Sequence, residues 1–183
     1  TQSAIDKLTE LHQSMVELPR GHTDEYMEQV MSCMHLQGHE RVLEIGGNIG
    51  RNTAVLGQII KSANAGGSVT TLETLKDEAS QLEALVKKNG FPVKVVNAAL
   101  SRVELVQSDW STAPKGADNT EGWQDIDTVL LEDLTEEGDF DTLVVDCEGA
   151  FEPILDEWPE LLDKASLVQI ENDFSTAESA SKV

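Results

Sequence analysis

Basic residues are scarce in this sequence. Thirteen Lys and Arg face 34 Asp and Glu among 183 residues, which gives a formal net charge of -21. No Lys/Arg-rich stripe offsets this charge locally, so the chain would repel a phosphate backbone. We therefore expect no nucleic acid among its partners.

Cysteines and long apolar runs are also lacking. The two cysteines, Cys33 and Cys147, stand far apart and match neither a zinc spacing nor a disulfide framework. No apolar run approaches the roughly 18 residues that cross a bilayer, and the charged, amphipathic N-terminal segment is not typical of a signal peptide. These absences predict two free thiols, no membrane partner and a cytoplasmic location.

The length is that of one domain with a core of its own. We expect a single domain over 1–183, with N-terminal helices in 1–38, a core in 39–174 and a tail in 175–183. The first helix carries Ile5, Leu8 and Leu11 on one face. The second is expected to bury a stripe of four apolar side chains: Met27, Val30, Met31 and Met34.

From Arg41 onward, short apolar runs alternate with helical patterns. The strand-like runs are 41–46, 68–73, 93–100, 140–146 and 166–171, and the helix-like segments are 51–63, 76–90 and 151–163. This order predicts an α/β fold, a Rossmann-like three-layer sandwich with a mostly parallel central sheet. Residues 108–125 break the rhythm and are interpreted as a long surface loop that acts as a lid.

A glycine-rich turn follows the first predicted strand. Ligands of open parallel sheets bind at the carboxyl ends of the strands, and Gly46, Gly47 and Gly50 let a ligand approach the backbone closely. The dinucleotide fingerprint G-x-G-x-x-G fails, because Asn48 and Arg51 stand where two of its glycines belong. Glu44, just before the turn, would repel a phosphate and favours a cationic ligand.

Two further strand ends predict an adenosine. Glu73 ends the second strand-like run, where a carboxylate can accept hydrogen bonds from ribose hydroxyls. Asn97, Ala98 and Ala99 end the third run, and their small size leaves room for a flat purine.

These segments resemble the FkbM-type family of S-adenosylmethionine-dependent methyltransferases, often described as O-methyltransferases. The most distinctive piece is DCEGA at 146–150, since the family carries Asp-x-Glu-Gly-Ala after its fourth strand. The other matching pieces are EIGGNIGRNT, TLETLKDEASQLEALVKKNG, VVNAALS, TVLLEDL, FDTLVVD and LVQIEND.

The resemblance implies roles for individual residues. Asp146 and Glu148 would be catalytic and face the reacting methyl group, and Asp146 would also contact the cofactor. S-adenosylmethionine, with S-adenosylhomocysteine as product, would be bound by the turn and the next two strand ends: Glu44, Gly46, Gly47, Asn48, Gly50, Thr53, Glu73, Ala98 and Ala99. The expected acceptor is a small molecule with a hydroxyl group.

Three alternatives stay open. The first is a metal-dependent enzyme resembling the catechol-type O-methyltransferases, with Mg²⁺ or Ca²⁺ held by Asp146, Glu171 and Asn172. The second is an NAD-dependent oxidoreductase, and the third is a non-catalytic module that binds an adenosine ligand. Methyltransferases of this fold normally add two strands after the fifth. Either these C-terminal strands are missing, or a partner subunit in a homo-oligomer covers the fifth-strand edge.

Overall fold

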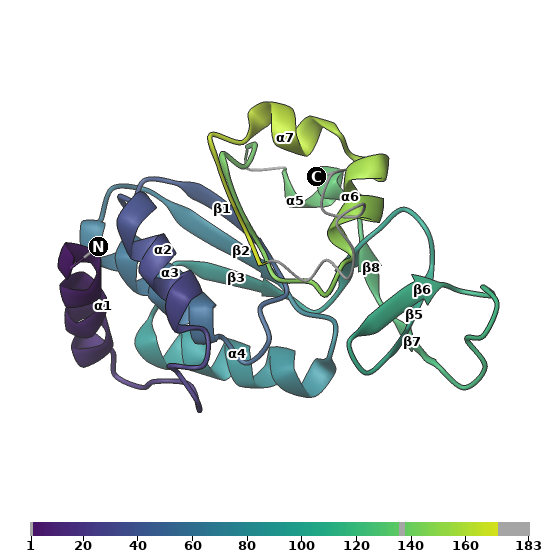
Figure 1. Ribbon diagram of the computed structural model, residues 1–183, viewed down its shortest axis with the longest axis horizontal. Helices are drawn as coiled ribbons and strands as arrows, with labels where there is room; N and C mark the ends of the chain where they lie inside the picture. The colour runs from purple at the N-terminus through teal and green to yellow at the C-terminus, as the bar shows by residue number, and fades with distance from the viewer. Residues whose placement is uncertain (1, 136–137, 172–183) are drawn as a thin grey trace.

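A five-stranded parallel sheet forms the centre of the molecule. The computed structural model describes residues 2–135 and 138–171 (Figure 1). The strand order is β10–β9–β1–β2–β3, with β1 Arg41–Ile45, β2 Ser68–Leu72, β3 Val93–Val96, β9 Thr142–Val145 and β10 Leu167–Ile170. The expected α/β fold with a mostly parallel central sheet is confirmed.

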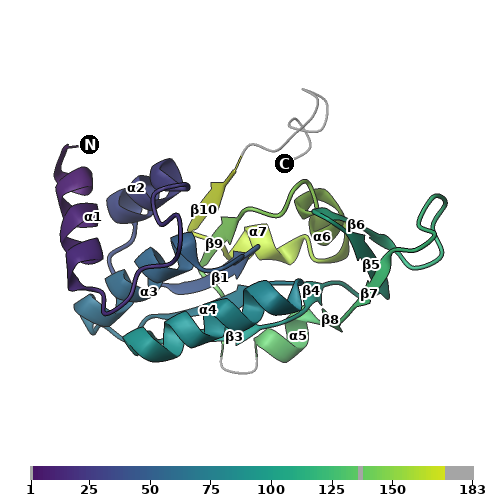
Figure 2. The ribbon, with the colours of Figure 1, turned by 90° about the horizontal axis from the view of Figure 1, so that it is seen from below.

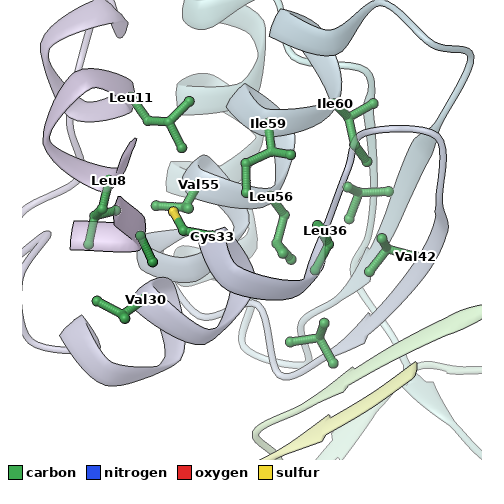
Figure 3. Packing of buried hydrophobic residues seen from close by; sticks show 13 residues of the cluster. Leu8, Leu11, Val30, Cys33, Leu36, Val42, Val55, Leu56, Ile59 and Ile60 are labelled. Carbon is green, nitrogen blue, oxygen red and sulfur yellow. The ribbon is translucent and has the colours of Figure 1, made fainter. Parts of the chain in front are cut away.

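Three helices cover one face of this sheet: α1 Gln2–Ser14, α2 Tyr26–His35 and α3 Arg51–Ala63. Side chains alternate along a strand, so Val42 and Val144 point to this face while their neighbours point away. They pack against Leu8, Val55 and Ile59 in one apolar cluster (Figure 3). Helix α4, Lys76–Asn89, follows β2 and packs against α3 through a separate cluster.

The other face is covered by α5 Leu131–Leu134, α6 Phe151–Glu157 and α7 Glu160–Lys164. Leu43 and Leu143 point to it and contact the fully buried Phe151 and Trp158. The single helix expected over 151–163 is divided, because Pro159 supplies no backbone N–H to continue α6.

The buried face of α2 differs from the prediction. Val30 is buried as expected, but Met27, Met31 and Met34 are 63%, 39% and 49% exposed. The buried positions also include Gln29, Ser32 and Cys33. Two of these polar side chains have long-range partners: Gln29 Nε2 donates to the carbonyls of His22 and Arg51, and the Ser32 hydroxyl donates to Gln169 and Asn52. Gln29 Oε1 has no hydrogen-bond partner among the residues described. The hydrogen bonds offset part of the cost of burying these polar groups, and the three methionines of the predicted stripe are left partly exposed.

Residues 108–125 are not a structureless loop. Strands β5 Leu105–Ser108, β6 Ser111–Pro114 and β7 Gln124–Ile126 form an antiparallel sheet in the order β6–β5–β7. Asp109 and Trp110 make the two-residue turn between β5 and β6, and Asp109 has the positive φ of 50° typical of such turns. Two short strands, β4 Ala99–Leu100 and β8 Thr128–Val129, flank this three-stranded sheet in the chain. It extends away from the central sheet on the side of α6 (Figures 1 and 2).

Strand β10 ends the central sheet. It pairs with β9 on one side, and no strand in 2–135 or 138–171 pairs with its other edge. Coverage of this edge by a second copy therefore stays a prediction. None of the helices in the described part of the chain is long and apolar enough to cross a membrane.

Candidate functional site

The turn after β1 is shaped by glycine. Gly46 has a φ of 94°, and a Cβ built there would lie 1.7 Å from the carbonyl oxygen of Asp146. Its N–H and that of Gly47 both donate to the Leu72 carbonyl, at 3.0 and 2.9 Å. The turn is thus clamped between the ends of β9 and β2, and only glycine fits at its first position.

Glu73 connects the end of β2 to the same turn. One carboxylate oxygen accepts the Asn48 N–H and the other accepts the Leu75 N–H, both at 2.7 Å. The side chain is buried, and burial raises its pKa although these two bonds act in the opposite direction. The carboxylate is therefore held at one place on the rim of the sheet.

Glu44 lies beneath the turn. Its side chain is 3% exposed, and its Oε2 accepts the Thr53 hydroxyl at 2.6 Å. Burial raises the pKa of Glu44 to about 7, and the Thr53 hydrogen bond only partly opposes this. The carboxylate thus supports the start of α3 from the interior of the domain.

The segment after β9 turns sharply at the same sheet edge. The Asp146 N–H donates to the Ile45 carbonyl at 2.9 Å, which aligns the ends of β1 and β9. Glu148 and Gly149 then adopt φ values of 51° and 85°. A left-handed backbone conformation is uncommon and strained for a residue such as Glu. Residues strained in this way cluster at functional sites.

A cavity of about 390 Å³ opens at these strand ends. Acidic groups dominate its charged lining, with seven carboxylate side chains: Asp24, Glu25, Glu73, Asp146, Glu148, Glu157 and Glu171. Arg51 is the one basic residue that lines it among the residues described. Such a cavity favours a neutral or cationic ligand over an anion.

The cavity brings together many of the residues that the sequence predicted. Those lining it are Gly46, Asn48, Glu73, Ala98, Ala99, Asp146, Glu148 and Glu171. The lining does not include Glu44, Gly47, Gly50 or Thr53, which lie behind or beside the turn. A direct contact between these four and a cofactor therefore stays a prediction, and the structure places them as supports of the turn.

The predicted metal site is only partly covered by the structure. Asp146 and Glu171 both line the cavity, whereas Asn172 lies outside the described residues. Within 2–135 and 138–171, no group of three or more His, Cys, Asp or Glu side chains is arranged to hold a metal ion.

The start of α2 contributes residues that sequence reasoning missed. Arg51 lies 3.4 Å from Glu25 and 3.6 Å from Asp24, and Glu25 also accepts the Asn52 N–H at the start of α3. Burial raises the pKa of Glu25, with the Arg51 contact opposing the shift. In the sequence these acids had only the signal of a helix start, because their partner is 26 or more positions away.

The antiparallel sheet supplies a second group of unpredicted residues. Leu105, Gln107, Thr112 and Pro114 all line the cavity, together with Trp110 at the hairpin turn. The available sequence signal was the pair of short runs LVQS and STAP around Asp109 and Trp110.

The fold is shared with known structures. Cofactor-bound Rv0187 from MTB is 18% identical, with a TM-score of 0.51, and the match covers 98% of this chain and 73% of that one. A Klebsiella pneumoniae protein proposed to be an O-methyltransferase has the same identity and coverages and a TM-score of 0.52. No protein-family model matches the sequence, and no curated protein matches it either. The structural likeness shows that the chain has the Rossmann-like fold of S-adenosylmethionine-dependent methyltransferases.

Proposed function

We propose that this chain is an S-adenosylmethionine-dependent methyltransferase that methylates a hydroxyl of a small molecule. The observation that carries the proposal is the site at the ends of β1 and β2. There the glycine turn and the fixed Glu73 carboxylate open together into the acidic cavity.

The donor set fits this cofactor. An ammonium and a sulfonium suit a cavity with seven carboxylates and one guanidinium, whereas a pyrophosphate would be repelled. Glu73 can accept hydrogen bonds from ribose hydroxyls, and the small side chains of Ala98 and Ala99 leave space for the purine. This charge pattern also argues against the NAD-dependent alternative.

When bound, S-adenosylmethionine supplies a methyl group on a sulfonium. The residues of this chain orient the acceptor and remove its proton. Asp146 and Glu148 line the cavity as candidate bases: either carboxylate would take the hydroxyl proton as the oxygen bonds to the methyl carbon and the carbon–sulfur bond breaks. The products are the methyl ether and S-adenosylhomocysteine.

We further propose membership of the FkbM-type family. It is supported by the Asp146–Ala150 segment, which the fold places directly after β9 and against the glycine turn. The metal-dependent variant is a separate proposal. We test it by thermal unfolding with Mg²⁺ before and after chelation, where an unchanged midpoint counts against a metal at Asp146 and Glu171.

Calorimetric titration with S-adenosylmethionine, S-adenosylhomocysteine and NAD tests the proposed function. We expect both sulfur ligands to bind and Glu73→Gln to weaken them roughly 10- to 100-fold, because hydrogen bonds to a charged group are worth about 1.5–3 kcal/mol. The control is Glu83→Gln, an exposed α4 residue that does not line the cavity. Tight binding of NAD without a response to either sulfur ligand would contradict the proposal. Binding of the sulfur ligands without methyl transfer would favour the non-catalytic module.

A further inference from the structure

One face of the β5–β6 hairpin is turned toward the cavity. In the antiparallel register, Leu105 is opposite Pro114 and Gln107 is opposite Thr112. Side chains of such pairs project from the same face of a sheet, and all four residues line the cavity. The hairpin thus closes the cavity opposite the strand ends.

Gln107 carries an unsatisfied polar atom on this face. The residue is 7% exposed, and its Nε2 donates to the Asp109 carbonyl at 2.9 Å. That bond fixes the amide orientation, since only the nitrogen can donate. Its Oε1 is buried and has no hydrogen-bond partner among the residues described. Buried acceptors are normally paired, so an acceptor without a partner on a residue that lines a cavity is a candidate contact for a donor on a ligand.

The surroundings limit what that ligand can be. Arg51, the basic residue of the cavity, is already within 3.4 Å of Glu25 and 3.6 Å of Asp24. An added anion would therefore meet a cavity with seven carboxylate side chains and one guanidinium that already contacts two of them. Leu105, Pro114 and the half-exposed Trp110 offer apolar and aromatic contacts beside the Gln107 oxygen.

We propose that this hairpin face is the methyl-acceptor subsite, where Gln107 Oε1 accepts a hydrogen bond from an N–H or O–H of the acceptor. The acceptor class is a neutral or cationic small molecule with an apolar or aromatic body. The inference rests on the proposed function and adds the acceptor's chemistry to it. The adenine amino group is another source of the same N–H chemistry, so the experiment separates the two.

Three phenols with one ring and different charges serve as probes: tyramine, tyrosol and 4-hydroxyphenylacetate. Ligand-observed NMR measures their binding to protein saturated with S-adenosylhomocysteine. We expect tyramine and tyrosol to bind more tightly than the anion, and Gln107→Leu to weaken tyrosol about 5- to 10-fold. Gln124→Leu is the matched control, because Gln124 pairs with Gln107 on β7 but is exposed and does not line the cavity.

A second variant distinguishes loss of a ligand contact from a structural effect of the substitution. Gln107→Glu adds a charge at the same place, so tyramine should gain affinity relative to tyrosol. Thermal unfolding of each variant reports whether it is folded. Equal binding of the anion and tyrosol, equal effects of Gln107→Leu and Gln124→Leu, or no binding of any phenol would overturn the proposal.

A separate comparison tests whether the hydrogen-bond donor to Gln107 is the adenine amino group. The comparison uses S-adenosylhomocysteine and its inosine analogue, in which a carbonyl oxygen replaces the amino group. If Gln107→Leu weakens only the former, Gln107 contacts adenine and the acceptor assignment is wrong. A wild-type protein that binds neither sulfur ligand contradicts the proposed function. A protein that binds them without discriminating the phenols contradicts this inference alone.

Discussion

The pKa of the Glu44 carboxyl group departs from the usual value for glutamate. Burial raises its pKa to about 7, above the ordinary value near 4.5. The folded state therefore holds a proton that the unfolded state has already released between these two pH values. Stability from the neutral form is complete below about pH 4.5 and is lost as the pH rises through 7, by about 3 kcal/mol. Glu44→Gln should remove this loss and make the protein more stable than wild type at pH 8.

Urea unfolding from pH 5 to pH 8 measures the effect. Glu40→Gln is the contrasting variant: burial would raise the Glu40 pKa, but bonds from the Gln37 and Gly38 N–H groups outweigh it and lower the pKa. Its removal should instead reduce stability at neutral pH. A Glu44→Gln protein with the wild-type pH profile would show that Glu44 is ionised throughout.

A substitution at Gly46 tests the close contact between the turn and the Asp146 carbonyl at the end of β9. Gly46→Ala should cost about 3 kcal/mol or more, because the new Cβ would overlap the Asp146 carbonyl and the φ of 94° is strained for alanine. Gly66→Ala is matched in strain, with a φ of 86°, but meets nothing within 4 Å. It should cost about 1–2 kcal/mol. Denaturant unfolding compares them, and equal losses would show that the contact with Asp146 is unimportant.

At the scale of elements, the position of α2 could be predicted from the sequence, whereas most of its buried face could not. Its helical pattern was sufficient to place the helix, but only Val30 of the four apolar residues predicted to be buried is buried. Gln29 and Ser32 are buried because their partners come from the segment before α2, from the start of α3 and from β10. Such distant hydrogen bonds leave no signal in the local pattern.

The exposed face of α2 gives a direct prediction. Met27→Gln should change the free energy of unfolding by less than about 0.5 kcal/mol, because this residue is 63% exposed. Val30→Ala should cost about 2 kcal/mol, since Val30 packs with α1 and α3. Urea unfolding of the two single variants tests this, and a larger loss for Met27→Gln than for Val30→Ala would support the buried face predicted from the sequence.

At the scale of the whole molecule, repeated strand–helix periodicity was enough to predict the parallel sheet and the edge where its strands end. Glu73 and Ala98 were therefore found from their positions and Asp146 from the resemblance of its segment to a known family, and the three residues line one cavity. Gln107 and Arg51 were not found, because the hairpin strands are short and partly polar and the Arg51 contacts join distant segments. Sequence position locates a strand end, whereas only packing shows which side chains face the ligand.

The net charge of -21 predicts how the whole fold responds to salt. The 34 acidic groups repel one another, and only 13 basic groups offset this repulsion. The repulsion destabilises the compact state more than the expanded one. Raising the KCl concentration from about 0.1 M to about 1 M shortens the screening length from roughly 10 Å to roughly 3 Å. The thermal unfolding midpoint should therefore rise with KCl, and calorimetry measures it.

A charge variant distinguishes screening from other effects of salt. Glu10 and Glu83 are exposed residues on α1 and α4, away from the cavity. Replacing both with Lys lowers the net negative charge without altering the core, so the variant should start with a higher midpoint at low salt and gain less from KCl. A midpoint that falls with KCl, or a variant with the same salt slope as wild type, would show that charge repulsion does not limit the stability of this fold.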